Sequence, residues 1–186
     1  MKWNEYLIAF EAVLSGKNKT APYDNDDYLE YVKLNSRRQN RWIKKMELSD
    51  GMLHSLNNLE SRQKWILITE PWCGDAAHIS PFINAMAESS PHIEFEIRLR
   101  DSAPLIIDQY LTNGGKAIPK LIVRDESGTD LFTWGPRPKE SQELMFSLKE
   151  TDLPEADKKA ALQKWYNKDK GETIQREILE LVNIHS

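Results

Sequence analysis

The chain has 186 residues, of which 40% are hydrophobic and 29% are charged, and its formal net charge at neutral pH is −4. This composition excludes a disordered or fibrous chain, and the length favours one globular domain with appendages. The mild negative charge gives no indication of a nucleic-acid or membrane surface. Basic side chains gather between residues 37 and 45. They would spread around most of a helix, so we interpret them as a solvated face.

Cys73 is the only cysteine, so no disulfide can form within the chain and a secreted disulfide framework is excluded. Residues 6–14 form a short apolar stretch, but Glu11 interrupts it and Glu5 precedes it. We therefore expect an amphipathic helix there rather than a signal peptide. No apolar run approaches the length of a membrane span. The cytoplasm is the expected location.

Residues 1–62 are polar and helical in pattern, and we predict an N-terminal helical extension. Asp26 and Asp27 stand before a long helical stretch that runs through Met46. Acidic residues favour a helix start because they accept hydrogen bonds from free amides and complement the helix dipole. Residues 49–51, Ser-Asp-Gly, are predicted to end this helix and to begin a short second one.

Residues 63–150 alternate short apolar runs with helical patterns, and they carry the predicted core fold. Residues 65–69 are continuously apolar up to a final threonine, as expected for a strand buried on both faces. Pro71 ends this strand, and residues 79–86 then carry an apolar stripe with helical spacing. Residues 93–99 alternate strictly between apolar and charged side chains, which predicts a strand with one wet face.

The second half of this region predicts a helix followed by a hairpin. Residues 103–111 have a helical pattern, which the Asn-Gly-Gly of residues 113–115 closes. Residues 118–123 predict a strand, and the Ser-Gly of residues 127–128 predicts a tight turn into a strand over residues 130–134. A βαβ unit followed by a hairpin indicates an α/β fold with a mixed sheet covered by helices.

Residues 151–186 predict a C-terminal helical extension that packs on the core. The helix starts after residues 151–154, and Gly171 is expected to divide it into two parts. Ile174, Ile178 and Leu181 form an apolar stripe in the second part. About half of the chain lies outside the core region, so we expect the N- and C-terminal helices to pack together against one face or edge of the sheet.

The segment over residues 70–81, Glu-Pro-Trp-Cys-Gly-Asp-Ala-Ala-His-Ile-Ser-Pro, resembles the active-site segment of the thioredoxin family. Trp72 stands directly before Cys73, Gly74 follows it, and Pro81 falls where the thioredoxin helix has its kinking proline. The resemblance implies a thioredoxin-like fold, with a mixed central sheet flanked by helices.

Further segments extend this resemblance over residues 63–150. Ile118 and Pro119 resemble the cis-proline segment that lies against the active-site sulfur in thioredoxins. In that family the backbone of the residue before this proline is free to pair with an extended peptide. Gly128 and Gly135 resemble the glycines of the hairpin turn and of the end of the last strand.

One departure from the family pattern concerns the second cysteine of the C-x-x-C motif. Ala76 stands in its place, so the thiol that would resolve a mixed disulfide is absent. The wider segment, with Asp75 and with residues 165–171, is similar to a subgroup of bacterial thioredoxin-like proteins with a W-C-G-D motif and extra terminal helices.

The chemistry of Cys73 depends on opposing influences. The free amides and the dipole at a helix N-terminus lower the pKa of a thiol. A nearby ionised Asp75 raises it, since like charges disfavour each other. The sequence leaves the net direction open. His78 lies five residues along and is not expected to contact the sulfur. A metal site made of Cys73, Asp75 and His78 is disfavoured because adjacent helical positions do not converge.

Two functions therefore remain as alternatives. In the first, Cys73 is the catalytic nucleophile of a monothiol thiol–disulfide exchange, and an external thiol resolves the adduct. The partner would be a protein disulfide or a small thiol such as glutathione, with no cofactor, metal, nucleic acid or membrane. In the second, the fold is a non-catalytic module that docks a peptide or protein. The predicted binding residues for either function are Trp72, Gly74, Asp75, Ile118 and Pro119.

Overall fold

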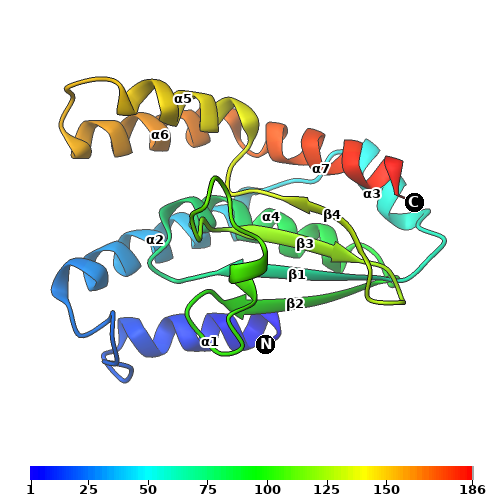
Figure 1. Cartoon of the computed structure of the whole chain (residues 1–186), viewed down its shortest axis with the longest axis horizontal. Helices are drawn as coiled ribbons and strands as arrows, with labels where there is room; N and C mark the ends of the chain where they lie inside the picture. The colour runs from blue at the N-terminus through cyan, green and yellow to red at the C-terminus, as the bar shows by residue number, and fades with distance from the viewer. Residues whose placement is uncertain (186) are drawn as a thin grey trace.

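The computed structural model describes residues 1–185 (Figure 1). Helices and strands follow one another in the order α1 (Trp3–Leu14), α2 (Asp26–Lys45), α3 (Asp50–Asn57), β1 (Gln63–Thr69), α4 (Gly74–Glu88), β2 (Ile93–Leu99), the 3₁₀ turn η1 (Ile106–Gln109), β3 (Lys120–Arg124), β4 (Asp130–Trp134), α5 (Lys139–Lys149), α6 (Glu155–Asp169) and α7 (Glu172–Ile184).

The four strands form a mixed sheet in the order β2-β1-β3-β4. β1 is parallel to β2, with Leu67 opposite Ile97, and antiparallel to β3, with Leu67 opposite Leu121. β3 and β4 form the predicted hairpin, whose turn contains Gly128 with a φ of +86°. The α/β architecture with a mixed sheet and added helices is therefore confirmed.

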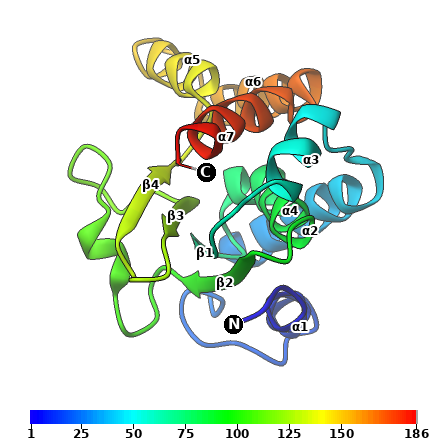
Figure 2. The same ribbon diagram turned by 90° about the vertical axis from the view of Figure 1, so that its right-hand side faces the viewer.

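One face of the sheet packs on the main hydrophobic core. Trp65 and Leu67 point from β1 into this core, where they meet Phe82 and Ile83 of α4. The apolar stripe of α7 also belongs to it, including Ile178. Figure 2 shows α4, α2, α3 and α7 on this side. Alternation along the strands places every second side chain here, as the period of a strand requires.

The opposite face is covered by a loop rather than by a helix, so the prediction of a helix over residues 103–111 is wrong. The segment forms only the turn η1, in which Ile107 is fully buried while Leu105 and Leu111 are 45% and 46% exposed. Pro104 lacks an N–H donor, and so little apolar surface is buried that the cost of nucleating a helix is not recovered.

The terminal helices are joined to the core at several places. Met1 exchanges two backbone hydrogen bonds of 2.8 Å with Ile97, so the N-terminus pairs with the edge strand β2. α1 buries Tyr6, Phe10 and Val13 in the main core. α3 contacts α7, so helices from the two ends of the chain lie side by side (Figure 2). Across residues 1–185, no helix has the length and apolar character that crossing a membrane requires.

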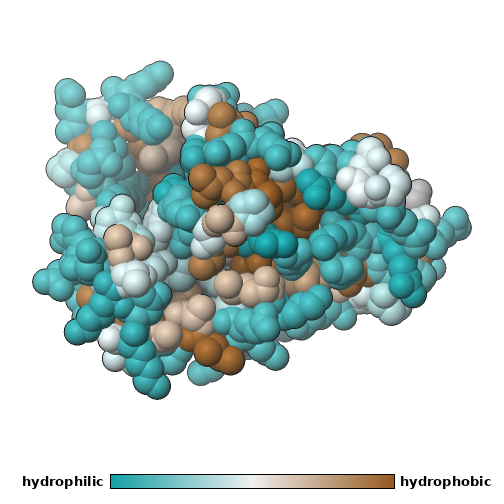
Figure 3. Space-filling view, turned by 60° about the horizontal axis from the view of Figure 1, so that its bottom comes forward, coloured by the Kyte–Doolittle hydropathy of each residue, from teal (hydrophilic) through white to brown (hydrophobic). Residues whose placement is uncertain are grey.

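The lower side of the molecule, turned toward the viewer in Figure 3, is mostly hydrophilic, with an apolar patch near its centre. Ile8, at 70% exposure, is the most open large apolar residue of α1. Single exposed apolar residues such as Ile8 are normal on protein surfaces and give no functional indication by themselves.

Candidate functional site

Cys73 lies where the loop after β1 meets α4, and it is the N-cap residue of that helix. Its Sγ–H donates a hydrogen bond of 3.4 Å to the carbonyl oxygen of Ile118, in the segment before β3. The residue is 6% exposed, because it packs in a small apolar cluster with Ile107 of η1 and with Ile68 of β1. The loop that covers part of this face of the sheet therefore also covers the sulfur.

Burial raises the pKa of the Cys73 thiol to about 12, and the charge of Asp75 adds to this effect. The backbone N–H groups of Ala76 and Asp75 and the guanidinium of Arg137 act in the opposite direction, because each favours the thiolate. Burial is the largest of these influences. The sulfur is therefore a protonated thiol at neutral pH in this conformation.

Asp75 is held by two residues from the C-terminal half of the chain. Nη2 of Arg137 lies 2.6 Å from one carboxylate oxygen, and the hydroxyl of Tyr166 donates a 2.9 Å hydrogen bond to the other. The side chains of Arg137 and Asp75 are 18% and 14% exposed. Burial strengthens such a pair and makes the loss of either partner costly. The first turn of α4 is thereby tied to the hairpin of α5 and α6.

His78 lies one turn further along α4 and makes no contact with the sulfur. Its Nδ1 accepts a 2.8 Å hydrogen bond from the indole N–H of Trp42, which requires that nitrogen to be unprotonated. Nε2 lies 2.9 Å from Oε1 of Gln163 and therefore carries the proton. Burial lowers the pKa of His78 to about 4. The ring stacks on Tyr166 at 4.4 Å, so His78 is a neutral packing residue between α2, α4 and α6.

Trp72 is half-buried beside Cys73, between an aromatic ring and a cation. Tyr28 meets its ring edge-on at 5.9 Å, and the guanidinium of Arg100 lies 4.6 Å from the ring centre. Asp101 binds Arg100 through two hydrogen bonds of 2.8 and 2.7 Å. The indole N–H of Trp72 is buried without a partner in the described chain. It is therefore a buried donor whose hydrogen-bonding capacity the described residues leave unsatisfied.

The other side of the loop is anchored by α2. Nδ2 of Asn35, which is fully buried, donates a 3.0 Å hydrogen bond to the carbonyl of Pro71. The Oδ1 atom of Asn35 accepts a 3.0 Å hydrogen bond from Nη1 of Arg38. A Cβ on Gly74 would lie 3.4 Å from that nitrogen. The absence of a side chain at residue 74 thus lets Arg38 lie against the start of α4.

The structure gathers most of the residues singled out in the sequence. Trp72, Gly74 and Ile118 lie around Cys73, and the peptide bond between Ile118 and Pro119 is cis. Pro119 packs against Gly135, where an added Cβ would lie 2.4 Å from the carbonyl oxygen of Pro119.

Asp75 and His78 face other partners than the sulfur, and the three potential metal ligands do not converge. Sequence reasoning missed the contributions of Asn35, Arg38 and Tyr166. Only the likeness of residues 165–171 to the W-C-G-D subgroup pointed toward Tyr166. Nothing in the local pattern pointed toward Asn35 or Arg38.

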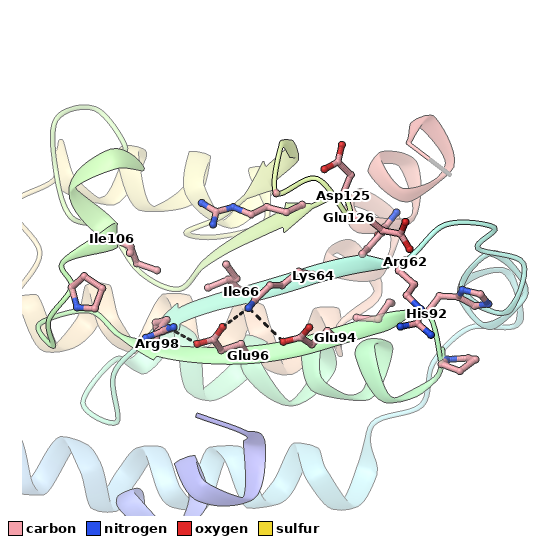
Figure 4. Close-up of a pocket in the computed structure, with 16 residues that line it drawn as sticks. Arg62, Lys64, Ile66, His92, Glu94, Glu96, Arg98, Ile106, Asp125 and Glu126 are labelled. Carbon is pink, nitrogen blue, oxygen red and sulfur yellow. Dashed lines mark ion pairs between the residues drawn. The ribbon is translucent and has the colours of Figure 1, made fainter.

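A groove of about 740 Å³ lies on the open face of the sheet, away from Cys73 (Figure 4). Lys64 stands in its centre, with Nζ 3.4 Å from Glu94 and 3.1 Å from Glu96. Arg98 forms a further ion pair with Glu96. The charges of the groove thus neutralise one another, which leaves the thiol loop as the better candidate for chemistry.

Comparisons with known proteins agree with this geometry. A family model described as thioredoxin matches residues 22–174. A crystal structure of a protein of unknown function from Pseudomonas aeruginosa is similar with a TM-score of 0.60 and 19% identity, over 84% of this chain and 91% of that one. An HIV epitope-scaffold is similar with a TM-score of 0.59 and 20% identity, over 83% of this chain and 90% of that one. No curated protein matches the sequence. The two structural likenesses show the fold alone, while the family match covers most of the sequence, and the chain therefore belongs to the thioredoxin family.

Proposed function

We propose that this protein carries out thiol–disulfide exchange through Cys73 as a lone thiol. The observation that carries the proposal is the position of the sulfur, at the start of α4 and 3.4 Å from the carbonyl of Ile118. Amide groups of the helix start favour the thiolate at that position. The segment from Trp72 to Asp75 supports placing the chain among thioredoxin-like proteins that lack the resolving cysteine.

The proposed step is a simple exchange. Cys73 loses its proton to solvent, and the thiolate attacks one sulfur of a disulfide. A bond forms between the two sulfur atoms as the old disulfide bond breaks, and the departing thiolate takes up a proton. A second external thiol then attacks the mixed disulfide and regenerates Cys73. Ala76 lies where an internal resolving thiol would be, so the second step needs a small thiol or a partner protein.

Reaction requires the sulfur to be uncovered first. Ile107 and the loop around it bury the thiol and raise its pKa. A substrate that displaces this loop removes the main cause of the raised pKa, so binding and activation are coupled. Glutathione or a protein disulfide in a reducing compartment such as the cytoplasm is the partner that this chemistry favours.

The second candidate is a binding module in which Cys73 has no chemical role. The observation that favours it is the burial of the sulfur, together with a pKa of about 12. In that case Trp72 and the backbone near Ile118 would dock a peptide, and the thiol would only fill space.

The reactivity of Cys73 toward disulfides separates the two functions. Incubation with glutathione disulfide should give a mixed disulfide at Cys73, detected by intact-mass spectrometry and lost in Cys73→Ser. A thiol that forms no adduct with any disulfide, while Cys73→Ser keeps partner binding, contradicts the exchange function and supports the binding module.

A further inference from the structure

Three arginines surround the thiol loop, and two of them are neutralised. Arg100 is bound by Asp101 through two hydrogen bonds, and Arg137 is bound by Asp75 at 2.6 Å. Arg38 differs, since it forms no ion pair with any carboxylate within residues 1–185. The loop therefore keeps one uncompensated positive charge.

Arg38 is positioned rather than free to move. Its Nη1 donates to Asn35, which in turn holds the carbonyl of Pro71 in the thiol loop. Gly74, the residue directly after Cys73, leaves the space in which the guanidinium lies. The side chain is half-buried, and burial lowers the pKa of Arg38. None of its nitrogen atoms is buried without a partner, so the remaining donors face solvent.

The surroundings of Arg38 add to its positive field. Arg41 lies one turn further along the same helix, and Lys159 of α6 reaches across to Tyr31 of α2. Arg41 donates to the side-chain oxygen of Asn167, which is neutral. Asp75 is the acidic group whose charge acts on Arg38, but its carboxylate is already bound by Arg137 and Tyr166.

We propose that Arg38 recognises a carboxylate of the substrate, and that the preferred substrate of Cys73 is a small disulfide that bears carboxylate groups. This inference rests on the proposed exchange function for its reaction, but the recognition itself can be measured without any reaction. Arginine suits this role because its planar donors match a carboxylate in two-point contact. The anchored guanidinium also needs little further ordering when it binds.

Binding is tested first with S-methylglutathione, which carries the carboxylates and cannot exchange. An NMR titration of the Cys73→Ser protein follows the amide of Gly74. We expect saturable shifts in this protein, and an affinity about tenfold weaker when Arg38→Met is added, as for the loss of one charge-assisted contact. Arg37→Met is the matched control, since it removes the same charge from an exposed site on α2 and should leave the affinity within about twofold.

The reaction is tested next with three disulfides of different charge. Wild-type protein should form its mixed disulfide faster with glutathione disulfide than with neutral hydroxyethyl disulfide, and slowest with cationic cystamine. Arg38→Met should slow only the reaction with glutathione disulfide, while Arg38→Lys should keep part of the preference. An unchanged rate with hydroxyethyl disulfide shows that the loop is intact in each variant.

The possible failures are distinguishable. If S-methylglutathione does not bind, or binds equally well to Arg38→Met, carboxylate recognition by Arg38 is wrong whatever Cys73 does. If Arg38→Met slows all three disulfides equally, Arg38 only supports the loop, and the inference is also wrong. If S-methylglutathione binds through Arg38 but no disulfide reacts, recognition stands and the exchange function falls.

Discussion

The hydroxyl of Tyr166 on α6 donates a 2.9 Å hydrogen bond to the carboxylate of Asp75 in the first turn of α4. The two residues are 91 positions apart in the sequence. Arg137, just before α5, holds the other carboxylate oxygen. The hairpin of α5 and α6 therefore fixes a negative charge close to the sulfur of Cys73, and the environment of the thiol depends on helices outside the core region.

Asp75→Asn is expected to make Cys73 more reactive. The substitution removes the charge that raises the pKa of the thiol and leaves Arg137 nearby, which lowers it. At a pH well below the pKa, the thiolate fraction rises about tenfold for each unit by which the pKa falls, and the alkylation rate rises with it by a smaller factor because a thiolate of lower pKa is a weaker nucleophile. The rate of iodoacetamide modification measured against pH gives this shift directly. Glu88→Gln removes one charge from the exposed far end of α4 and should leave the rate unchanged. An equal rate in Asp75→Asn and wild type contradicts the prediction.

His78 should make stability depend on pH in the mildly acidic range. Its pKa is about 4 in the folded protein and near 6.5 in the unfolded chain, so the unfolded chain takes up a proton first as the pH falls. The stabilisation that neutral His78 provides is complete above pH 6.5. Between pH 6.5 and about 4 the free energy of unfolding falls by about 3 kcal/mol at most. Chemical denaturation gives the free energies of unfolding of wild type and His78→Gln at several pH values. Their difference isolates the effect of His78, because all other groups titrate in both proteins. A constant difference between the two across this range argues against a neutral buried His78.

Gly171→Ala is expected to destabilise the protein by about 2–4 kcal/mol, because it combines backbone strain with a clash. Gly171 has a φ of +83°, and an added Cβ would lie 2.2 Å from Cζ of buried Phe82. Gly128→Ala is the matched control, since its φ is +86° and no atom of residues 1–185 lies within 4 Å of the added atom. It should cost about 1 kcal/mol, from strain alone. Thermal unfolding gives both values, and equal losses would show that the contact with Phe82 does not matter.

Phe10→Ala should cost about 3–5 kcal/mol, although α1 lies outside the region matched by the thioredoxin family model. Phe10 is 4% exposed in the main core, so its removal leaves a cavity between α1 and the rest of the protein. Ile8→Ala, on the same helix at 70% exposure, should change the unfolding free energy by less than about 0.5 kcal/mol. A midpoint of denaturation for Phe10→Ala that equals that of the wild type contradicts the prediction.

Much of the fold could be predicted from local patterns. The alternation over residues 93–99 corresponds to β2, and the apolar run before Pro71 corresponds to the buried part of β1. Gly171 separates α6 from α7, as its position predicted. These elements follow from periodicity and from residues that end helices and strands, which act over a few positions. The prediction of a helix over residues 103–111 was wrong, because this segment buries too little apolar surface to stabilise a helix. A local pattern does not report how much surface a segment buries.

The sequence by itself determined the lone thiol and its setting, since Trp72, Cys73 and Gly74 are consecutive and Ala76 removes any internal partner. The sequence leaves open whether the pKa of Cys73 is raised or lowered, because the helix start lowers it and the charge of Asp75 raises it. Only the tertiary structure decided it, since burial among apolar side chains that include Ile107, 34 positions away, outweighs both. The positions of Arg38 and Tyr166 at the thiol loop were likewise decided only by the tertiary structure. Desolvation and charge act through space, and which side chains meet at the thiol loop depends on how distant helices pack.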